Sequence, residues 1–101
     1  METLVTAGIV AYNGAAEVAQ AAHSVARHTH GVRLRMMVLD NASPDGAGKK
    51  LQKMSMPENV QVVCSEKNIG FGQGHNRIFA ELNRDGLSRY HVVINPDITL
   101  D

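Results

Sequence analysis

Short apolar runs alternate with amphipathic segments along the chain. Runs rich in β-branched residues predict buried strands, and apolar residues that recur every three to four positions predict helices. The predicted strands are Leu4–Ala11, Leu34–Leu39, Val60–Cys64 and Tyr90–Ile94. The predicted helices are Ala15–His28, Ser43 to about Met54, and Asn76–Asn83, the last preceded by a glycine-rich loop from Asn68 to Gly74.

The strict alternation of strand and helix determines the predicted architecture. Crossovers of this kind join parallel strands and are right-handed, which places helices on both faces of one sheet. We therefore predict an α/β fold, a three-layer α/β/α sandwich of the Rossmann-like kind. Its strands are expected in the order 3-2-1-4, because the polar strand ends must share an edge to form one site. At 101 residues the chain is one domain or part of one.

Three local details accompany this prediction. Ser43 followed by Pro44 is a good helix opening, with a hydroxyl cap and a proline in the first turn. In the third helix, Ile78, Phe79 and Leu82 are expected to point inward. The apolar run before Asn95 predicts that the fourth strand is buried.

Polar side chains follow three of the predicted strands directly. Tyr12 and Asn13 come after the first strand, Asp40 ends the second, and Asn95-Pro96-Asp97 follows the fourth. In open α/β sheets, ligands bind at the carboxyl ends of the strands. Two acids delivered to that edge indicate a site for a polyhydroxylated or phosphorylated ligand with a cation nearby.

Composition narrows the classes of partner. The formal net charge is zero and no basic run occurs, which disfavours nucleic acid and anionic membranes as partners. No apolar stretch approaches the roughly 20 residues of a membrane span, and the acidic start is unlike a signal peptide. One cysteine, Cys64, excludes an internal disulfide and favours a reducing, cytoplasmic location. Since the chain ends directly after its last polar motif, we expect the natural domain to continue beyond Asp101.

Three familiar site motifs do not fit the sequence. The glycines of Gly70–Gly74 suggest a dinucleotide fingerprint, but there the acid should follow the glycines, and Asp40 precedes them. The segment Gly46–Lys50 lacks the first glycine and the final Ser or Thr of a P-loop. Three histidines lack a second pair of zinc ligands at suitable spacing and are interpreted as solvated: His23, His28 and His30.

The remaining motifs together resemble the family 2 glycosyltransferases of the GT-A fold, especially their rhamnosyltransferase-like branch. The similarity covers nearly the whole chain, from about Val5 to Asp97. Each motif alone is weak, and their common order makes the resemblance specific. The four motifs are Val10–Asn13, Val38–Ser43, Asn68–Asn76 and Ile94–Asp97.

The resemblance implies a set of nucleotide contacts. The turn of Ala11, Tyr12 and Asn13, together with Asp40, would hold the nucleoside of a dTDP- or UDP-sugar donor. The loop from Asn68 through Gly70, with Asn76 nearby, would shape the nucleotide pocket.

The same resemblance implies the ribose and cation contacts. Asn95-Pro96-Asp97 stands where the family has an Asp-x-Asp element, which binds ribose and a divalent cation, Mg²⁺ or Mn²⁺. Because the first acid is Asn95, metal binding would rest on Asp97. The family's general base and its site for a glycan or lipid-linked acceptor would lie beyond this chain, so no residue is assigned as catalytic.

Alternative interpretations stay open from the residues alone. Asp40 could cap a helix, Tyr12 could pack as an edge aromatic, and Asn68 and Asn76 could serve only to fix the loop. At the level of function, a nucleotidyltransferase and a non-catalytic nucleotide-binding module compete with the glycosyltransferase. The turn after the first strand has no basic residue for a triphosphate, which disfavours the nucleotidyltransferase. An exposed sheet edge would also allow a homodimer.

Overall fold

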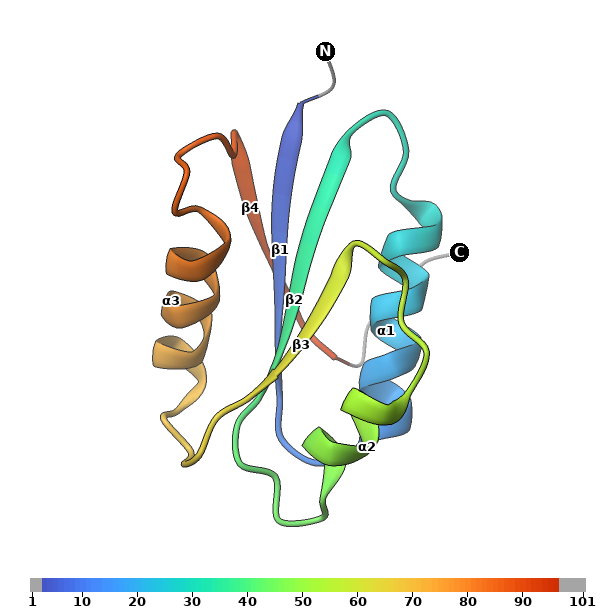
Figure 1. Ribbon diagram of the computed structural model, residues 1–101, viewed down its shortest axis with the longest axis vertical. Helices are drawn as coiled ribbons and strands as arrows, with labels where there is room; N and C mark the ends of the chain where they lie inside the picture. The colour runs from blue at the N-terminus through green and yellow to red at the C-terminus, as the bar shows by residue number, and fades with distance from the viewer. Residues whose placement is uncertain (1–2, 97–101) are drawn as a thin grey trace.

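The computed structural model describes residues 3–96, which form one parallel sheet with helices on both faces (Figure 1). Within this range the strands are β1 (Leu4–Ala11), β2 (Arg33–Asp40), β3 (Val60–Cys64) and β4 (Tyr90–Ile94). The helices are α1 (Ala15–His28), α2 (Ala47–Lys53) and α3 (Phe71–Leu82). Across the described residues, no helix has the length and apolarity that spanning a bilayer requires.

The sheet has the predicted order, β3-β2-β1-β4, and every pairing is parallel. Helices α1 and α2 lie on one face and α3 on the other, which confirms the three-layer α/β/α sandwich (Figure 1). The register aligns Ala11 with Asp40 and Asp40 with Cys64. The carboxyl ends of the three strands therefore form one continuous edge.

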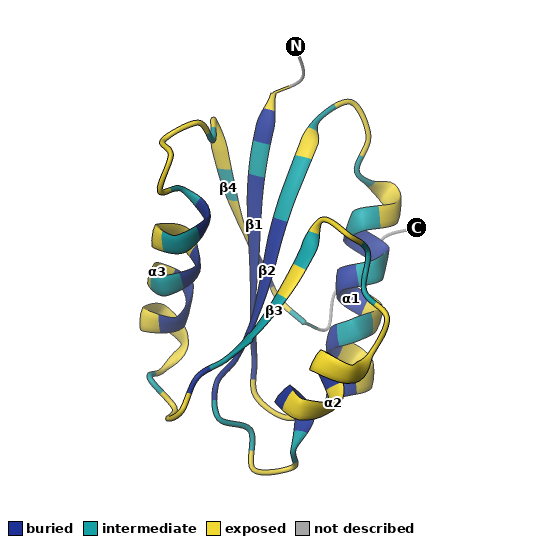
Figure 2. Cartoon of the chain, viewed as in Figure 1, coloured by how far each residue is buried: buried dark blue, intermediate teal, exposed yellow. Residues whose placement is uncertain are grey.

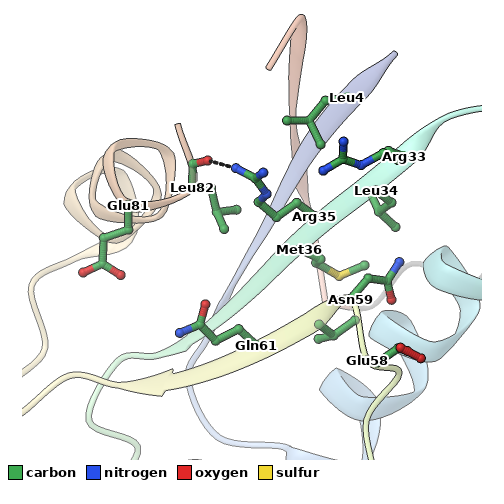
Figure 3. Close-up of a pocket in the computed structure, with 11 residues that line it drawn as sticks. Leu4, Arg33, Leu34, Arg35, Met36, Glu58, Asn59, Gln61, Glu81 and Leu82 are labelled. Carbon is green, nitrogen blue, oxygen red and sulfur yellow. Dashed lines mark hydrogen bonds between the residues drawn. The ribbon is translucent and has the colours of Figure 1, made fainter. Parts of the chain in front are cut away.

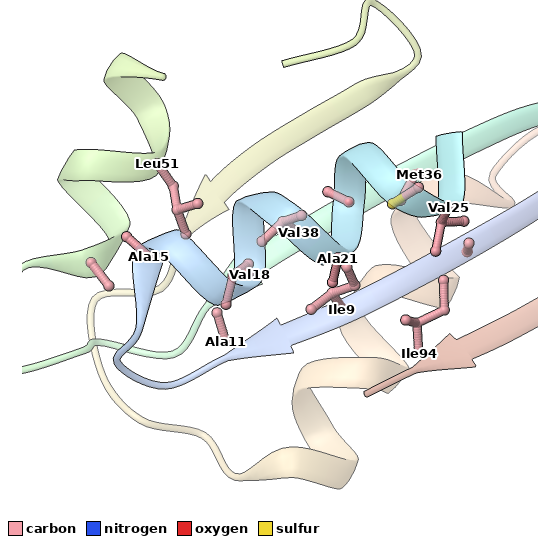
Figure 4. Packing of buried hydrophobic residues seen from close by; sticks show 13 residues of the cluster. Ile9, Ala11, Ala15, Val18, Ala21, Val25, Met36, Val38, Leu51 and Ile94 are labelled. Carbon is pink, nitrogen blue, oxygen red and sulfur yellow. The ribbon is translucent and has the colours of Figure 1, made fainter. Parts of the chain in front are cut away.

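The central strand β1 divides the core into two clusters. Ile9 and Ala11 face α1, where they form one cluster with Val18 of that helix and Ile94 of β4, as Figure 4 shows. Val10 packs in the cluster on the other face, which includes α3. Burial on both faces explains why β1 reads as a nearly continuous apolar run. Figure 2 shows this burial along most of β1.

Of the three predicted helix starts on the ligand edge, that of α1 at Ala15 is confirmed and those of α2 and α3 were wrong. Helix α2 begins at Ala47 and not at Ser43, because residues 43–46 form a turn in which Gly46 N–H donates to Ser43 O. The Ser43 hydroxyl binds Asp40 instead of capping the helix. Helix α3 begins at Phe71, five residues before the predicted start. The second half of the glycine-rich segment is thus its first turn, with Gly74 N–H donating to Gly70 O.

Two predictions of burial were also wrong. Phe79 is half exposed and not in the core, although Ile78 and Leu82 are buried as predicted. The Phe79 ring packs edge-on against His91 of β4. Strand β4 is mostly exposed as well, since Tyr90, Val92 and Val93 are exposed and only Ile94 is buried. Within residues 3–96, β4 pairs with β1 alone, so its outer edge is free.

Candidate functional site

The polar strand ends converge at one edge of the sheet. Asp40 ends β2 and lies level with Ala11 of β1, and Asn95 follows β4 on the other side of β1. The chain moves from β1 to β2 on one side and reaches β4 on the other, so this is the point at which the strand order reverses. Ligands of doubly wound sheets bind at such a switch point.

Asp40 is the most strongly positioned of the predicted residues. Its side chain is buried, at 3% exposure. One carboxylate oxygen accepts the Ser43 hydroxyl at 2.5 Å, and the other accepts the Ser43 N–H at 3.1 Å. A carboxylate has about four acceptor positions, so two remain for a ligand. The capping alternative is therefore wrong, because Asp40 fixes a turn that lies before α2, and the N-cap of that helix is Gly46.

A cavity of about 360 Å³ opens beside Asp40. Gly48 of α2 forms part of its wall, and a Cβ at this position would lie 2.6 Å from Asp40 Oδ2 and 2.7 Å from Cys64 Sγ. Only glycine lets the helix approach the carboxylate this closely. The residues that line the cavity come from β2, the following turn, α2 and the end of β3: Asp40, Ala42, Ser43, Pro44, Gly46, Gly48, Lys49, Cys64, Ser65 and Glu66.

The charges around this cavity are mixed. Burial raises the pKa of the Cys64 thiol, the neighbouring Asp40 carboxylate raises it further, and Lys49 opposes them. Lys49 is exposed on α2, as the sequence predicts, but it also lines the cavity. Cys64, predicted to be core filler, is half-buried and forms part of the same wall. A ligand here would meet an acceptor in Asp40 and a cation in Lys49.

The turn after β1 is tied to the turn after β2. Asn13 N–H donates to the Ser43 hydroxyl at 2.7 Å, and Gly14 N–H donates to Asp45 Oδ2 at 3.0 Å. Asp45 also accepts the Ala47 N–H that opens α2. The Gly14 N–H is the main reason that the pKa of the Asp45 carboxyl lies below its usual value. Tyr12 is 54% exposed beside this network, so it is not the packed edge aromatic of the alternative interpretation.

The loop between β3 and α3 is tied to β2 by Asn41, a residue to which the sequence analysis gave no role. Its side-chain amide donates to Gly70 O at 3.1 Å, and its carbonyl oxygen accepts Ile69 N–H at 2.9 Å. Within the loop, the Asn68 carbonyl oxygen accepts Gly70 N–H at 2.8 Å. Asn68 therefore has the local role that was left open for it, and its exposure leaves its amide group accessible to a ligand.

The remaining predicted site residues that the structure describes do not line the cavity beside Asp40. Asn76 is exposed on the second turn of α3, and Asn95 is exposed just after β4. Neither lines the cavity beside Asp40. Asp97, the predicted metal ligand, lies outside the described residues. Within residues 3–96, no three His, Cys, Asp or Glu side chains are grouped so that they could hold a metal ion.

A second cavity, of about 400 Å³, lies at the opposite edge, near the amino ends of β1, β2 and β3 (Figure 3). Two of its charged groups, Arg35 and Glu81, already have partners. Arg35 donates to Leu82 O at 3.0 Å and pairs with Asp85 at 3.2 Å. The Leu87 N–H, followed by Arg35, accounts for the lowered pKa of the Asp85 carboxyl. This cavity lies far from the polar strand ends, and we give it no role in the site.

Comparison with known protein families identifies the family of this chain. A model of glycosyl transferase family 2 matches residues 6–101, which is nearly the whole chain. The chain belongs to glycosyltransferase family 2. A search of curated proteins found no match. The family match spans all four motifs that carried the resemblance, including the turn after β1 and the Asp40 strand end.

Family membership gives this glycosyltransferase chain a nucleotide-sugar-binding region, and the structure shows which residues share the relevant edge. Asn41, Lys49 and Cys64 are the residues that the sequence analysis missed. Asn41 follows a predicted strand directly, which is a usable signal. Cys64 ends a predicted strand and pairs with Asp40 in the sheet register, which is a signal of the same kind. Lys49 carries no such signal, because only the packing of α2 brings it beside Asp40.

Proposed function

We propose that this edge binds a nucleoside-diphosphate sugar, dTDP- or UDP-linked, for transfer to a glycan or lipid-linked acceptor. The observation that carries the proposal is the buried Asp40 carboxylate, which faces a cavity at the carboxyl edge of the sheet in a family 2 glycosyltransferase. A carboxylate with two free acceptor positions suits an imide N–H or the ribose hydroxyls. Rhamnosyl transfer remains a proposal from the motif resemblance.

The proposed donor contacts follow from the same arrangement. Tyr12 offers an exposed ring beside the turn. Ala11 and Asn13 stay proposed contacts through the family resemblance, since the Ala11 carbonyl accepts Asn41 N–H and the Asn13 N–H donates to Ser43. Gly70 at the start of α3 has a φ of +83°, where a side chain would be strained, so a ligand can approach the loop closely there. Its N–H and carbonyl are themselves bound to Asn68, Asn41 and Gly74. Asn68, Asn76 and Asn95 add exposed amide groups that can bind phosphate or ribose oxygens.

A divalent cation, Mg²⁺ or Mn²⁺, belongs to the proposal through Asp97. The described residues supply no metal cluster of their own. That is compatible with Mg²⁺ chemistry, because this ion is commonly held by one or two carboxylates together with substrate phosphates. When bound, the cation would supply positive charge against the diphosphate leaving group. Asp97 would be its protein ligand in this chain.

One observation weighs against the nucleotidyltransferase alternative. The turn after β1 would have to receive a triphosphate, and in this chain an acid already occupies it. The Asp45 carboxylate accepts the Gly14 N–H and Asn13 binds the Asp45 N–H, so a second anion would be repelled there. A non-catalytic nucleotide-binding module would share the site and differ only in lacking transfer. For that reason activity of a longer chain would separate it from an enzyme.

We also propose that residues 1–101 alone transfer no sugar. A glycosyl transfer needs a base for the acceptor hydroxyl and a wall that holds this hydroxyl in line. The candidate site described above supplies neither of them. A cytoplasmic location and a homodimer formed through the free edge of β4 are also proposals.

Titration calorimetry with UDP, dTDP, ADP and GDP, each with and without Mn²⁺, tests the proposal. We expect UDP or dTDP to bind more tightly than the purine diphosphates, and Mn²⁺ to strengthen binding. Asp40→Ala should weaken binding by roughly 1.5–3 kcal/mol in both conditions, since one hydrogen bond to a charged group is lost. Gln61→Ala, a change of an exposed residue at the opposite cavity, is the matched control. Equal affinity for all four nucleotides would reject the proposal.

A further inference from the structure

Asn41 connects the two halves of the ligand edge. Its main chain belongs to the sheet, because its N–H donates to Ala11 O at 2.8 Å. Its side chain belongs to the loop, because it binds Gly70 O and Ile69 N–H. The residue is 3% exposed, so water competes little for these bonds. Asn41 therefore fixes Ile69 and Gly70, which lie almost 30 residues further along the chain, against the ends of β1 and β2.

The loop that Asn41 holds opens helix α3. Gly70 O accepts the Asn41 amide at 3.1 Å and also accepts Gly74 N–H, the first hydrogen bond of α3, at 3.0 Å. A carbonyl oxygen has two lone pairs, and here both are used. The Gly70 carbonyl oxygen therefore joins the first turn of α3 to Asn41, the residue next to Asp40.

We propose that Asn41 is a positioning residue for nucleotide binding: it holds the Asn68–Gly70 loop at the distance from Asp40 that the ligand requires. This inference rests on the proposed function, because it assigns the loop and Asp40 to one ligand. The segment that precedes this loop supplies Ser65 and Glu66 to the Asp40 cavity. Ser65 N–H is bound to Asp40 O at 2.8 Å, so the near end of the loop is anchored without Asn41. Asn41 anchors the far end.

The amide group is matched to this position by its chemistry. One end must accept from Ile69 N–H and the other must donate to Gly70 O. Only a planar group with a donor and an acceptor satisfies both bonds. An ionised carboxylate of the same shape would keep the bond to Ile69 and place a second oxygen against Gly70 O. A protonated carboxyl would satisfy both again, which gives the proposal a pH signature.

The first test compares UDP or dTDP affinity, with Mn²⁺, for the wild-type chain and for Asn41→Ala. Loss of the two bonds should reduce affinity about tenfold, the equivalent of one to two net hydrogen bonds. Asn59→Ala is the matched control, since this asparagine is exposed at the amino end of β3 and should leave affinity unchanged. Hydrogen exchange should become faster at the Ile69 amide of Asn41→Ala, while the Ser65 amide stays protected.

The second test uses Asn41→Asp, which keeps the shape of the side chain and should fold even where Asn41→Ala does not. Its affinity should be about tenfold below that of the wild type at pH 8, and the ratio of the two affinities should approach one as the pH falls towards the carboxyl pKa. A residue that only stabilises the fold would show no such recovery in the ratio.

The outcomes separate the two proposals. If the wild-type chain binds neither UDP nor dTDP, the proposed function is rejected, and this inference is rejected with it. If the wild type binds and both Asn41 variants bind equally well at every pH, the positioning role is wrong while the proposed function stands. Weak binding by the Asn41 variants, with pH-dependent recovery for Asn41→Asp and normal binding by Asn59→Ala, supports the inference.

Discussion

Replacing Gly48 by alanine is the sharpest test of the Asp40 cavity. In an exposed helix this change would stabilise the protein by about 1 kcal/mol, because alanine has the higher helix propensity. Here the new methyl group would lie 2.6 Å from Asp40 Oδ2, 2.7 Å from Cys64 Sγ and 2.8 Å from Asp40 Cγ. All three distances are shorter than a normal van der Waals contact.

The carboxylate has little freedom to move aside. Ser43 holds both of its oxygens, and the residue ends a buried strand. Either Asp40 breaks its bonds to Ser43 or α2 moves away from β3. Overpacking of this kind costs about 1–3 kcal/mol. After the gain in propensity of about 1 kcal/mol is subtracted, we expect Gly48→Ala to lower the free energy of unfolding by about 1 kcal/mol.

Urea unfolding followed by circular dichroism measures this change. The midpoint should fall by up to about 1 M, given a slope of about 1–3 kcal/mol/M for a small protein. Gly72→Ala is the matched control, because a Cβ there meets nothing within 4 Å in the first turn of α3. Its midpoint should stay the same or rise. A midpoint for Gly48→Ala at or above that of the wild type would show that Asp40 is not fixed, and the reasoning about the cavity would fail.

Three further predictions follow from buried groups and from the metal position. Burial lowers the pKa values of His75 and His91 below the ordinary 6.5, so the unfolded chain binds protons that the folded chain does not. Stability should therefore be complete above about pH 6.5 and decline as the pH falls below it, with a smaller decline in His75→Phe, as thermal melts from pH 8 to 5 would show. Cys64 should react slowly with iodoacetamide at pH 7.5, and faster in Asp40→Ala, because removing that carboxylate lowers the thiol pKa; mass spectrometry that finds equal rates would contradict this. Asp97→Asn should abolish the Mn²⁺-dependent part of UDP or dTDP binding and leave the metal-free part intact, and an equal loss in both conditions would argue against a metal role.

The architecture was predictable because it depends on patterns that are local in sequence. Period-two and apolar runs identify strands, helical spacing identifies helices, and their alternation leaves few topologies. The order 3-2-1-4 and the three layers were confirmed. The position of Asp40 at the ligand edge was predictable for the same reason, since a residue that ends a buried parallel strand must lie at the carboxyl edge.

Helix α1 begins at Ala15 as predicted. The starts of α2 and α3 were not predictable, because side-chain hydrogen bonds in the turns that precede them decide them. Ser43 has the composition of a helix cap, yet its hydroxyl binds Asp40 and accepts Asn13 N–H from another turn. The glycines after Gly70 have the composition of a loop, yet they form the first turn of α3. In both places a tertiary contact outweighs a propensity worth about 1 kcal/mol.

By itself the sequence determined the sheet, its order, the family resemblance and the edge where the polar residues gather, because each of these follows from strand ends and motif order. Only the tertiary structure decided which side chains share a cavity. Gly48 meets Asp40 because α2 packs over the ends of β2 and β3, Cys64 meets Asp40 through the register of β3 on β2, and Asn41 meets Gly70 because the loop folds back over β2. These contacts join residues 8 to 29 positions apart, and no pattern along the chain records which of them come within hydrogen-bond distance.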